Sequence, residues 1–151
     1  MGHEVTAEGE FELPAPFENA LEAWPPRAHA LAVEKGFYGK QEDLEELLQL
    51  QGRSDLLDYV RNLFMASRLA LIHAEVSEAL ECVARQKLET YTPGPGWSPD
   101  AKPEGLPIEL ADVFLRLADL AGHLGIDLNA AAEQKHRFNE RRPLMHGGKV
   151  L

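Results

Sequence analysis

The chain has 151 residues, of which 44% are hydrophobic, and its single cysteine is Cys82. This length suits one domain with a sizeable core, and one cysteine excludes a disulfide or a cysteine-based zinc site within one chain. The net charge of −10 argues against a nucleic-acid partner. No apolar run suits a membrane span, and the acidic N-terminus lacks the apolar core of a secretion signal. We therefore expect a cytoplasmic protein without a membrane partner.

The pattern along the chain predicts one all-α domain between two tails. Residues 1–14 are acidic and aperiodic, which predicts a disordered tail. Residues 15–143 carry the helical periodicity and form the expected domain. Residues 144–151 are basic and contain Gly147-Gly148, which predicts a flexible end.

The first helices are short in this prediction. A helix over 17–24 is broken by Pro25-Pro26, because a residue before proline is disfavoured in helical conformation. The next helix runs from Pro26 to about Lys35, with Gly36 as its C-terminal cap. A third helix covers 42–50.

A long helical stretch follows. Ser54 is the expected N-cap, and residues 55–87 contain neither glycine nor proline. Their apolar residues recur near helical spacing. The stretch forms either one long helix or two, with a break near Ala66-Ser67.

Two pairs of acidic residues recur at a spacing of three. Glu75 and Glu78 lie in the long stretch, and Glu109 and Asp112 open the next predicted helix, over 108–124. Residues three apart share a helix face, where like charges repel. A cation would reverse that cost, and four carboxylates around one point suit Mg²⁺, with Mn²⁺ as a substitute. The alternative is a solvated acidic face, which is common.

The loop over 92–107 is rich in proline and glycine, which suits an exposed crossover or a lid. Trp97 in this loop either covers a ligand or anchors the loop. Pro107 fits the first turn of the helix that follows. Gly125 ends that helix, and Asp127 is the expected N-cap of a last helix reaching about Arg141.

Phe37 and Tyr38 follow the end of a predicted helix and precede Gly39. Exposed aromatic rings at this position would stack on a nucleobase. The other interpretation is that they close the core over the helix end, as aromatic side chains mostly do. Both interpretations can hold together.

Basic and amide side chains cluster towards the C-terminus. Lys135, Asn139 and Arg142 share one face of the last predicted helix. Lys149 follows two glycines in the tail and is a candidate for closing over phosphate oxygens. The alternative is that these cations complement the dipole of the helix.

The order of these motifs resembles that of the MazG-like all-α nucleoside triphosphate pyrophosphohydrolases. The resemblance covers roughly residues 27–151, and the ordered set is far more specific than any one motif. The matching motifs are Glu75-x-x-Glu78, Glu109-Leu-Ala-Asp112, Gly125-Ile-Asp-Leu128, Lys135-x-x-x-Asn139-x-x-Arg142-Pro143 and His146-Gly-Gly-Lys149.

This resemblance implies a bundle of about four or five main helices per protomer, working as a homodimer or a dimer of dimers. It implies Mg²⁺-dependent hydrolysis of a nucleoside triphosphate to the monophosphate and pyrophosphate, as nucleotide-pool house-cleaning. The implied metal ligands and catalytic residues are Glu75, Glu78, Glu109 and Asp112. The implied substrate contacts are Lys135, Asn139 and Arg142.

Two other functions compete with this one. A di-iron carboxylate bundle uses Glu-x-x-His pairs, and neither Glu75 nor Glu109 has a histidine three positions on. The other is a non-catalytic helical module that senses nucleotides or binds proteins and has lost its chemistry. The intact acidic pairs and the intact basic helix argue against that loss, and a turnover assay decides between the two. The preferred base and sugar stay open.

Overall fold

The computed structural model describes residues 20–94 and 101–142, so both tails, Trp97 and Lys149 lie outside the described residues. The described residues contain five helices and no strand, which confirms the all-α class. The helices are α1 (Ala20–Glu34), α2 (Gly39–Leu50), α3 (Ser54–Ala84), α4 (Leu106–Leu124) and α5 (Leu128–Glu140).

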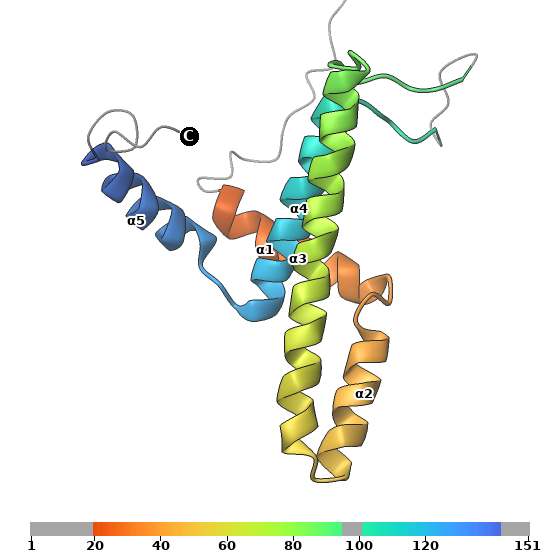
Figure 1. Ribbon diagram of the computed structural model, residues 1–151, viewed down its shortest axis with the longest axis vertical. Coiled ribbons are helices and arrows are strands. Elements are labelled where there is room, and N and C mark those ends of the chain that lie inside the picture. The colour runs from red at the N-terminus through yellow and green to blue at the C-terminus, as the bar shows by residue number, and fades with distance from the viewer. Residues whose placement is uncertain (1–19, 95–100, 143–151) are drawn as a thin grey trace, which may run out of the picture.

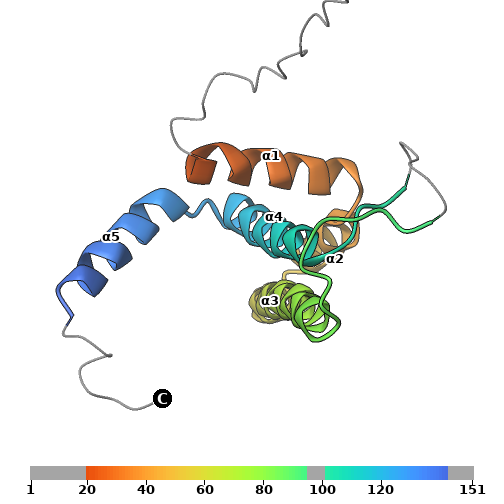
Figure 2. The same cartoon turned by 90° about the horizontal axis from the view of Figure 1, so that it is seen from above.

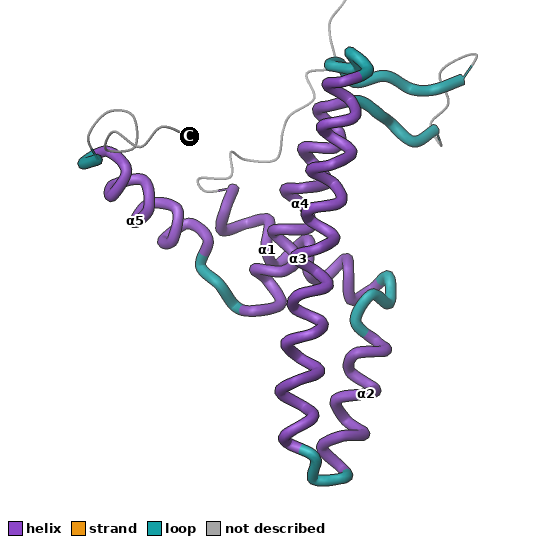
Figure 3. The backbone as a smooth tube through the Cα atoms, in the orientation of Figure 1, coloured by secondary structure: helices purple, strands orange, loops and turns teal. Residues whose placement is uncertain are grey.

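Helix α4 lies at the centre of the fold. It runs beside the second half of α3 (Figure 1), and α1 and α3 lie on opposite sides of it (Figure 2). Helix α2 folds back beside the first half of α3, whereas α5 points away from the other helices (Figure 3). The core at α4 is built from small and medium side chains: Ala32, Ala118, Leu120 and Ala121.

The predicted break at Pro25-Pro26 is wrong, because both prolines lie inside the continuous helix α1. Each proline removes one backbone hydrogen bond from a helix interior. Tertiary packing offsets that loss here, since α1 and α4 approach closely at Gly122. A Cβ atom at this glycine would lie 2.4 Å from the carbonyl oxygen of Pro25 and 2.8 Å from the Cβ atom of His29.

Helix α3 is one uninterrupted helix, so the one-helix alternative holds and there is no break near Ser67. Ser67 and Ser77 donate hydrogen bonds to backbone carbonyls within the helix, which satisfies their hydroxyl groups. The expected N-cap is wrong by one residue: Arg53 occupies that position, without a side-chain cap, and Ser54 begins the helix.

The ends of α4 and α5 agree with the predictions. Pro107 lies in the first turn of α4, and Gly125 has the left-handed conformation, with φ of +64°, at its C-terminal end. The Asp127 side chain accepts a hydrogen bond from the Ala130 backbone N–H at 2.8 Å, so it caps α5. None of the helices in the described ranges has the length and apolar character of a membrane span.

Candidate metal centre

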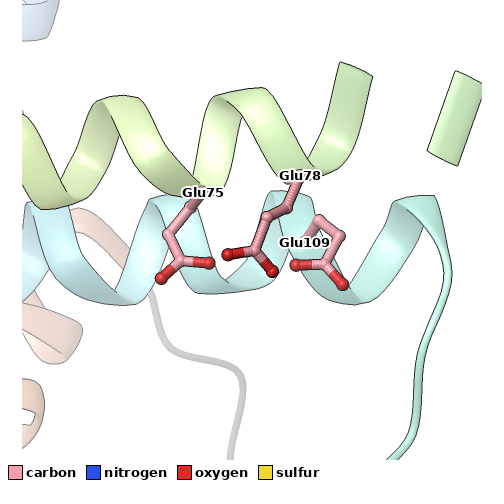
Figure 4. A group of neighbouring side chains, drawn as sticks. All are labelled: Glu75, Glu78 and Glu109. Carbon is pink, nitrogen blue, oxygen red and sulfur yellow. The ribbon is translucent and has the colours of Figure 1, made fainter. Parts of the chain in front are cut away.

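Three glutamates from two helices converge in the groove between α3 and α4. Glu75 and Glu78 come from α3 and Glu109 from α4, as Figure 4 shows. One carboxylate oxygen from each residue lies within 4.8 Å of the other two. Glu75 and Glu109 are each 6% exposed, whereas Glu78 is exposed. The geometry brings three oxygen ligands of the kind that hard divalent cations prefer to one point.

Glu109 is the most unfavourably placed of these carboxylates. Its Oε2 atom is buried and has no hydrogen-bond partner among the described residues. Burial raises the pKa of Glu109, and the charge of Glu78 raises it further, whereas Lys102 opposes the shift. A buried, unpaired carboxylate costs free energy unless a cation or a proton compensates it.

Arg116 fixes the orientation of Glu75. The Nε–H group of Arg116 on α4 donates to Glu75 Oε1 on α3. This ion pair joins α4 to α3. It leaves the second oxygen of Glu75 for another ligand, because a carboxylate accepts at both oxygens.

Asp112, the fourth predicted ligand, is not in the group of three. It is half-buried one turn further along α4, and its charge contributes to the raised pKa of Glu109. Asp112 instead lines a neighbouring cavity. The predicted meeting of four carboxylates at one point is therefore observed for three of them.

A mostly apolar cavity of about 470 Å³ adjoins the glutamates on one side, among α1, α3 and α4. Arg68, Asp112 and Asp119 are polar residues at this cavity. Its volume lies in the range of small-molecule sites, which combine apolar walls with a few polar groups. The apolar wall consists of Leu31, Phe37, Phe64, Leu71 and Leu115.

The two candidate stacking aromatics have different environments. Phe37 is 71% exposed at the rim of the apolar cavity. Tyr38 is 1% exposed, and the guanidinium carbon of Arg68 lies 3.6 Å from the centre of its ring. The core interpretation therefore holds for Tyr38, whose ring presents no face to a base, while Phe37 remains accessible to a ligand.

Asp119 is the centre of a polar cluster that the sequence analysis missed. Its Oδ1 atom accepts a hydrogen bond from the Tyr38 hydroxyl at 2.8 Å and lies 3.0 Å from His29 Nδ1. Arg68 is 3.9 Å from its Oδ2 atom. Burial and the Asp119 contact raise the pKa of Tyr38. These partners come from α1, α3 and the turn before α2, so no local sequence signal reveals them.

A smaller, polar cavity of about 180 Å³ adjoins the glutamates on the opposite side. Glu78 and Glu109 line it together with Cys82 and Lys102. The groove therefore has an apolar cavity, three carboxylates and a polar cavity in that order. Its α3 side includes a row of residues spaced three or four apart, which share one helix face: Phe64, Arg68, Leu71, Glu75, Glu78 and Cys82.

The predicted basic contacts are not brought to the carboxylates within one chain. Lys135 and Asn139 are exposed on α5, and Arg142 is exposed just beyond it. Helix α5 packs lightly against α1 and diverges from the groove (Figure 2). Lys135 and Arg142 instead lie near the ring of Phe138, at 5.1 and 6.0 Å from its centre.

Comparisons with protein-family models, with curated proteins and with solved structures found no match for this chain.

Proposed function

We propose that the protein is a Mg²⁺-dependent hydrolase that cleaves a nucleoside triphosphate to the monophosphate and pyrophosphate. One observation carries the proposal: Glu75, Glu78 and Glu109 bring three carboxylate oxygens within 4.8 Å of one another, and a buried oxygen of Glu109 has no hydrogen-bond partner in the part of the chain that the structure describes. The motif order that resembles the MazG-like pyrophosphohydrolases points to the same chemistry.

The residues present fit a divalent cation. Glu75 and Glu109 are buried and offer hard oxygen atoms, and their mutual repulsion with Glu78 is relieved when a cation lies between them. When bound, Mg²⁺ supplies charge neutralisation for the phosphates and activation of water. Arg116 holds Glu75 in place, and Asp112 lies one turn away as a further acceptor.

The apolar cavity supports a nucleoside as the other part of the substrate. In the proposed complex the base enters this cavity and stacks on Phe37, the exposed aromatic at its rim. Water then attacks the α-phosphorus, the bond to the bridging oxygen breaks, and pyrophosphate leaves with that oxygen. A carboxylate of the Glu75–Glu78 pair accepts the proton of the water.

Self-association belongs to the same proposal. The second half of α3 exposes apolar side chains on one face, spaced seven, four and three residues apart: Leu69, Val76, Leu80 and Val83. Contiguous exposed apolar surface of this kind marks interfaces. We propose a homodimer, or a dimer of dimers, that buries this face. Within one chain α5 does not reach the groove, so a contribution of Arg142 to phosphate binding requires a second copy.

A panel of canonical and damaged nucleoside triphosphates tests the function. With Mg²⁺, chromatography should show monophosphate and pyrophosphate in equal amounts, and EDTA should abolish the reaction. Glu75→Gln should lose turnover, whereas Glu46→Gln on α2, an exposed glutamate outside the group of three, should keep it. Activity that survives EDTA would refute the proposal. Nucleotide binding without turnover under all conditions would favour the sensing module instead.

A further inference from the structure

We propose that the polar cavity beside Lys102 binds the pyrophosphate end of the triphosphate, with Lys102 as its principal phosphate contact. This inference rests on the proposed function and deepens it. It assigns the leaving group to residues of the loop before α4 rather than to the basic face of α5.

Hydrogen bonds join the two ends of the loop between α3 and α4. They fix the position of the backbone close to Lys102. The backbone of Tyr91 pairs with that of Glu104 through two hydrogen bonds of 2.9 Å, and the Leu106 N–H donates to the Lys87 carbonyl at 2.9 Å. Gly105 allows the two ends of the loop to approach each other closely. Its φ is +112°, and a Cβ atom there would lie 2.1 Å from the Glu89 carbonyl oxygen.

Lys102 differs from the other two basic residues that line this cavity, whose charged groups already have partners. Arg85 forms an ion pair with Glu81 at 3.0 Å, and the ammonium group of Lys87 donates to the Tyr91 hydroxyl. Lys102 makes no hydrogen bond or ion pair with any other residue in the described ranges. Its charge reaches Glu109, whose pKa it acts to lower. A flexible ammonium group of this kind is a common phosphate ligand.

The sizes of the two cavities assign the two ends of the substrate. The polar cavity, at about 180 Å³, is smaller than typical organic-ligand sites of about 300–1,000 Å³, so it suits a compact polar group. The apolar cavity, at about 470 Å³, lies within that range. At a rise of about 1.5 Å per residue, Leu71 and Glu78 are about 10 Å apart along α3. A ribose and its α-phosphate bridge a distance of this order.

Four glutamates also line the polar cavity, so an anion would need a divalent cation to offset their charge. These are Glu78, Glu81, Glu104 and Glu109. Tyr91 already satisfies Glu104, to which its hydroxyl donates at 2.8 Å, and Arg85 satisfies Glu81. The two remaining glutamates, Glu78 and Glu109, are those proposed to hold the metal, whose charge would relieve their repulsion of the phosphates.

Cys82 provides a direct readout, because it is the only cysteine and it lines the polar cavity. The experiment measures the rate of Cys82 alkylation by iodoacetamide, at constant excess Mg²⁺, as inorganic pyrophosphate is titrated. Pyrophosphate should slow the alkylation of the wild-type protein. Lys102→Ala should raise the half-protecting concentration about tenfold, and Lys102→Arg should restore it to within about threefold of the wild-type value.

Lys40→Ala on α2 is the matched charge control, and it should match the wild type. No protection of Cys82 at saturating pyrophosphate would overturn the proposal, as would equal protection of Lys102→Ala and the wild type. A larger effect of Arg142→Ala than of Lys102→Ala would overturn it too. Turnover of triphosphates without Cys82 protection would refute this inference alone. Protection without turnover would support this inference and refute the proposed function.

Discussion

Replacing Glu109 with glutamine should stabilise the metal-free protein and abolish its response to Mg²⁺. The substitution keeps the shape of the side chain but removes the charge of a buried carboxylate, whose Oε2 atom has no hydrogen-bond partner within residues 20–94 and 101–142. Two like charges at the 4.8 Å limit of this cluster repel by about 0.9 kcal/mol in water and about 3.5 kcal/mol at an effective dielectric constant of about 20. Water around the exposed Glu78 places the expected gain nearer the lower value, at about 1–2 kcal/mol.

The expected gain corresponds to a rise in Tm of about 3–6 °C for a chain of this size. Thermal unfolding in EDTA measures it, and the same scan at rising Mg²⁺ measures the metal response. Wild-type protein should gain about 2.7 kcal/mol when Mg²⁺ reaches a hundred times its Kd, whereas Glu109→Gln should gain almost nothing. Glu46→Gln, an exposed change on α2, should behave as the wild type in both scans.

The pH dependence of this effect has a definite sign. Because the pKa of Glu109 is raised in the folded protein, folding favours the protonated form. The charge penalty is therefore present at neutral pH and disappears as pH falls through the raised pKa. The stabilities of wild type and Glu109→Gln should converge on acidification. A variant that is less stable than the wild type in EDTA and still responds to Mg²⁺ would refute the reasoning.

Four further outcomes are expected. Gly122→Ala should cost about 1–3 kcal/mol in chemical denaturation, because its Cβ atom would force α1 and α4 apart. Phe37→Ala should raise the KM for the preferred nucleotide about tenfold with little change in Tm, while Phe138→Ala, an exposed aromatic on α5, should leave KM unchanged. Leu80→Glu should convert an oligomer to monomers in light scattering, because its side chain is 68% exposed on the apolar face of α3. Burial and the charge of Arg68 lower the pKa of His123, so the free energy of unfolding should decrease as the pH is lowered below about 6.5. His123→Asn should make this decrease smaller when unfolding is measured as a function of pH.

Local sequence signals predicted the C-terminal end of α4 and the N-terminal end of α5, where one residue decides the conformation. Gly125 has the left-handed conformation that ends α4, and Asp127 caps α5 through its own side chain. The same reasoning failed at Pro25-Pro26, because local propensity does not include the packing of α1 on α4. The close contact at Gly122 joins residues almost one hundred positions apart.

The candidate site, too, was predicted where local spacing decides the arrangement and was missed where tertiary packing decides it. The spacing of Glu75 and Glu78 placed them on one face of α3, and Glu109 meets them as expected. The sequence did not reveal Asp119 as the partner of Tyr38 and His29. It also did not reveal that α5 leaves the groove, because the direction of a helix after a glycine turn is set by tertiary packing.

The order of features along the groove bears on where the proposed hydrolase would cut a triphosphate. If the base occupies the apolar cavity, its boundary at Leu71 lies about 6 Å along α3 from Glu75. One ribose spans that distance, so the carboxylates lie over the α-phosphate, and two phosphates remain for the polar cavity at Lys102. A cut at the γ-phosphate would move the terminal phosphate to the carboxylates. The base would then be drawn out of the apolar cavity by two phosphate lengths, and the polar cavity would hold nothing. In the proposed complex, burial of the base and pairing of Lys102 would therefore be satisfied together only by attack at the α-phosphorus, which would leave the oxygen of water in the monophosphate.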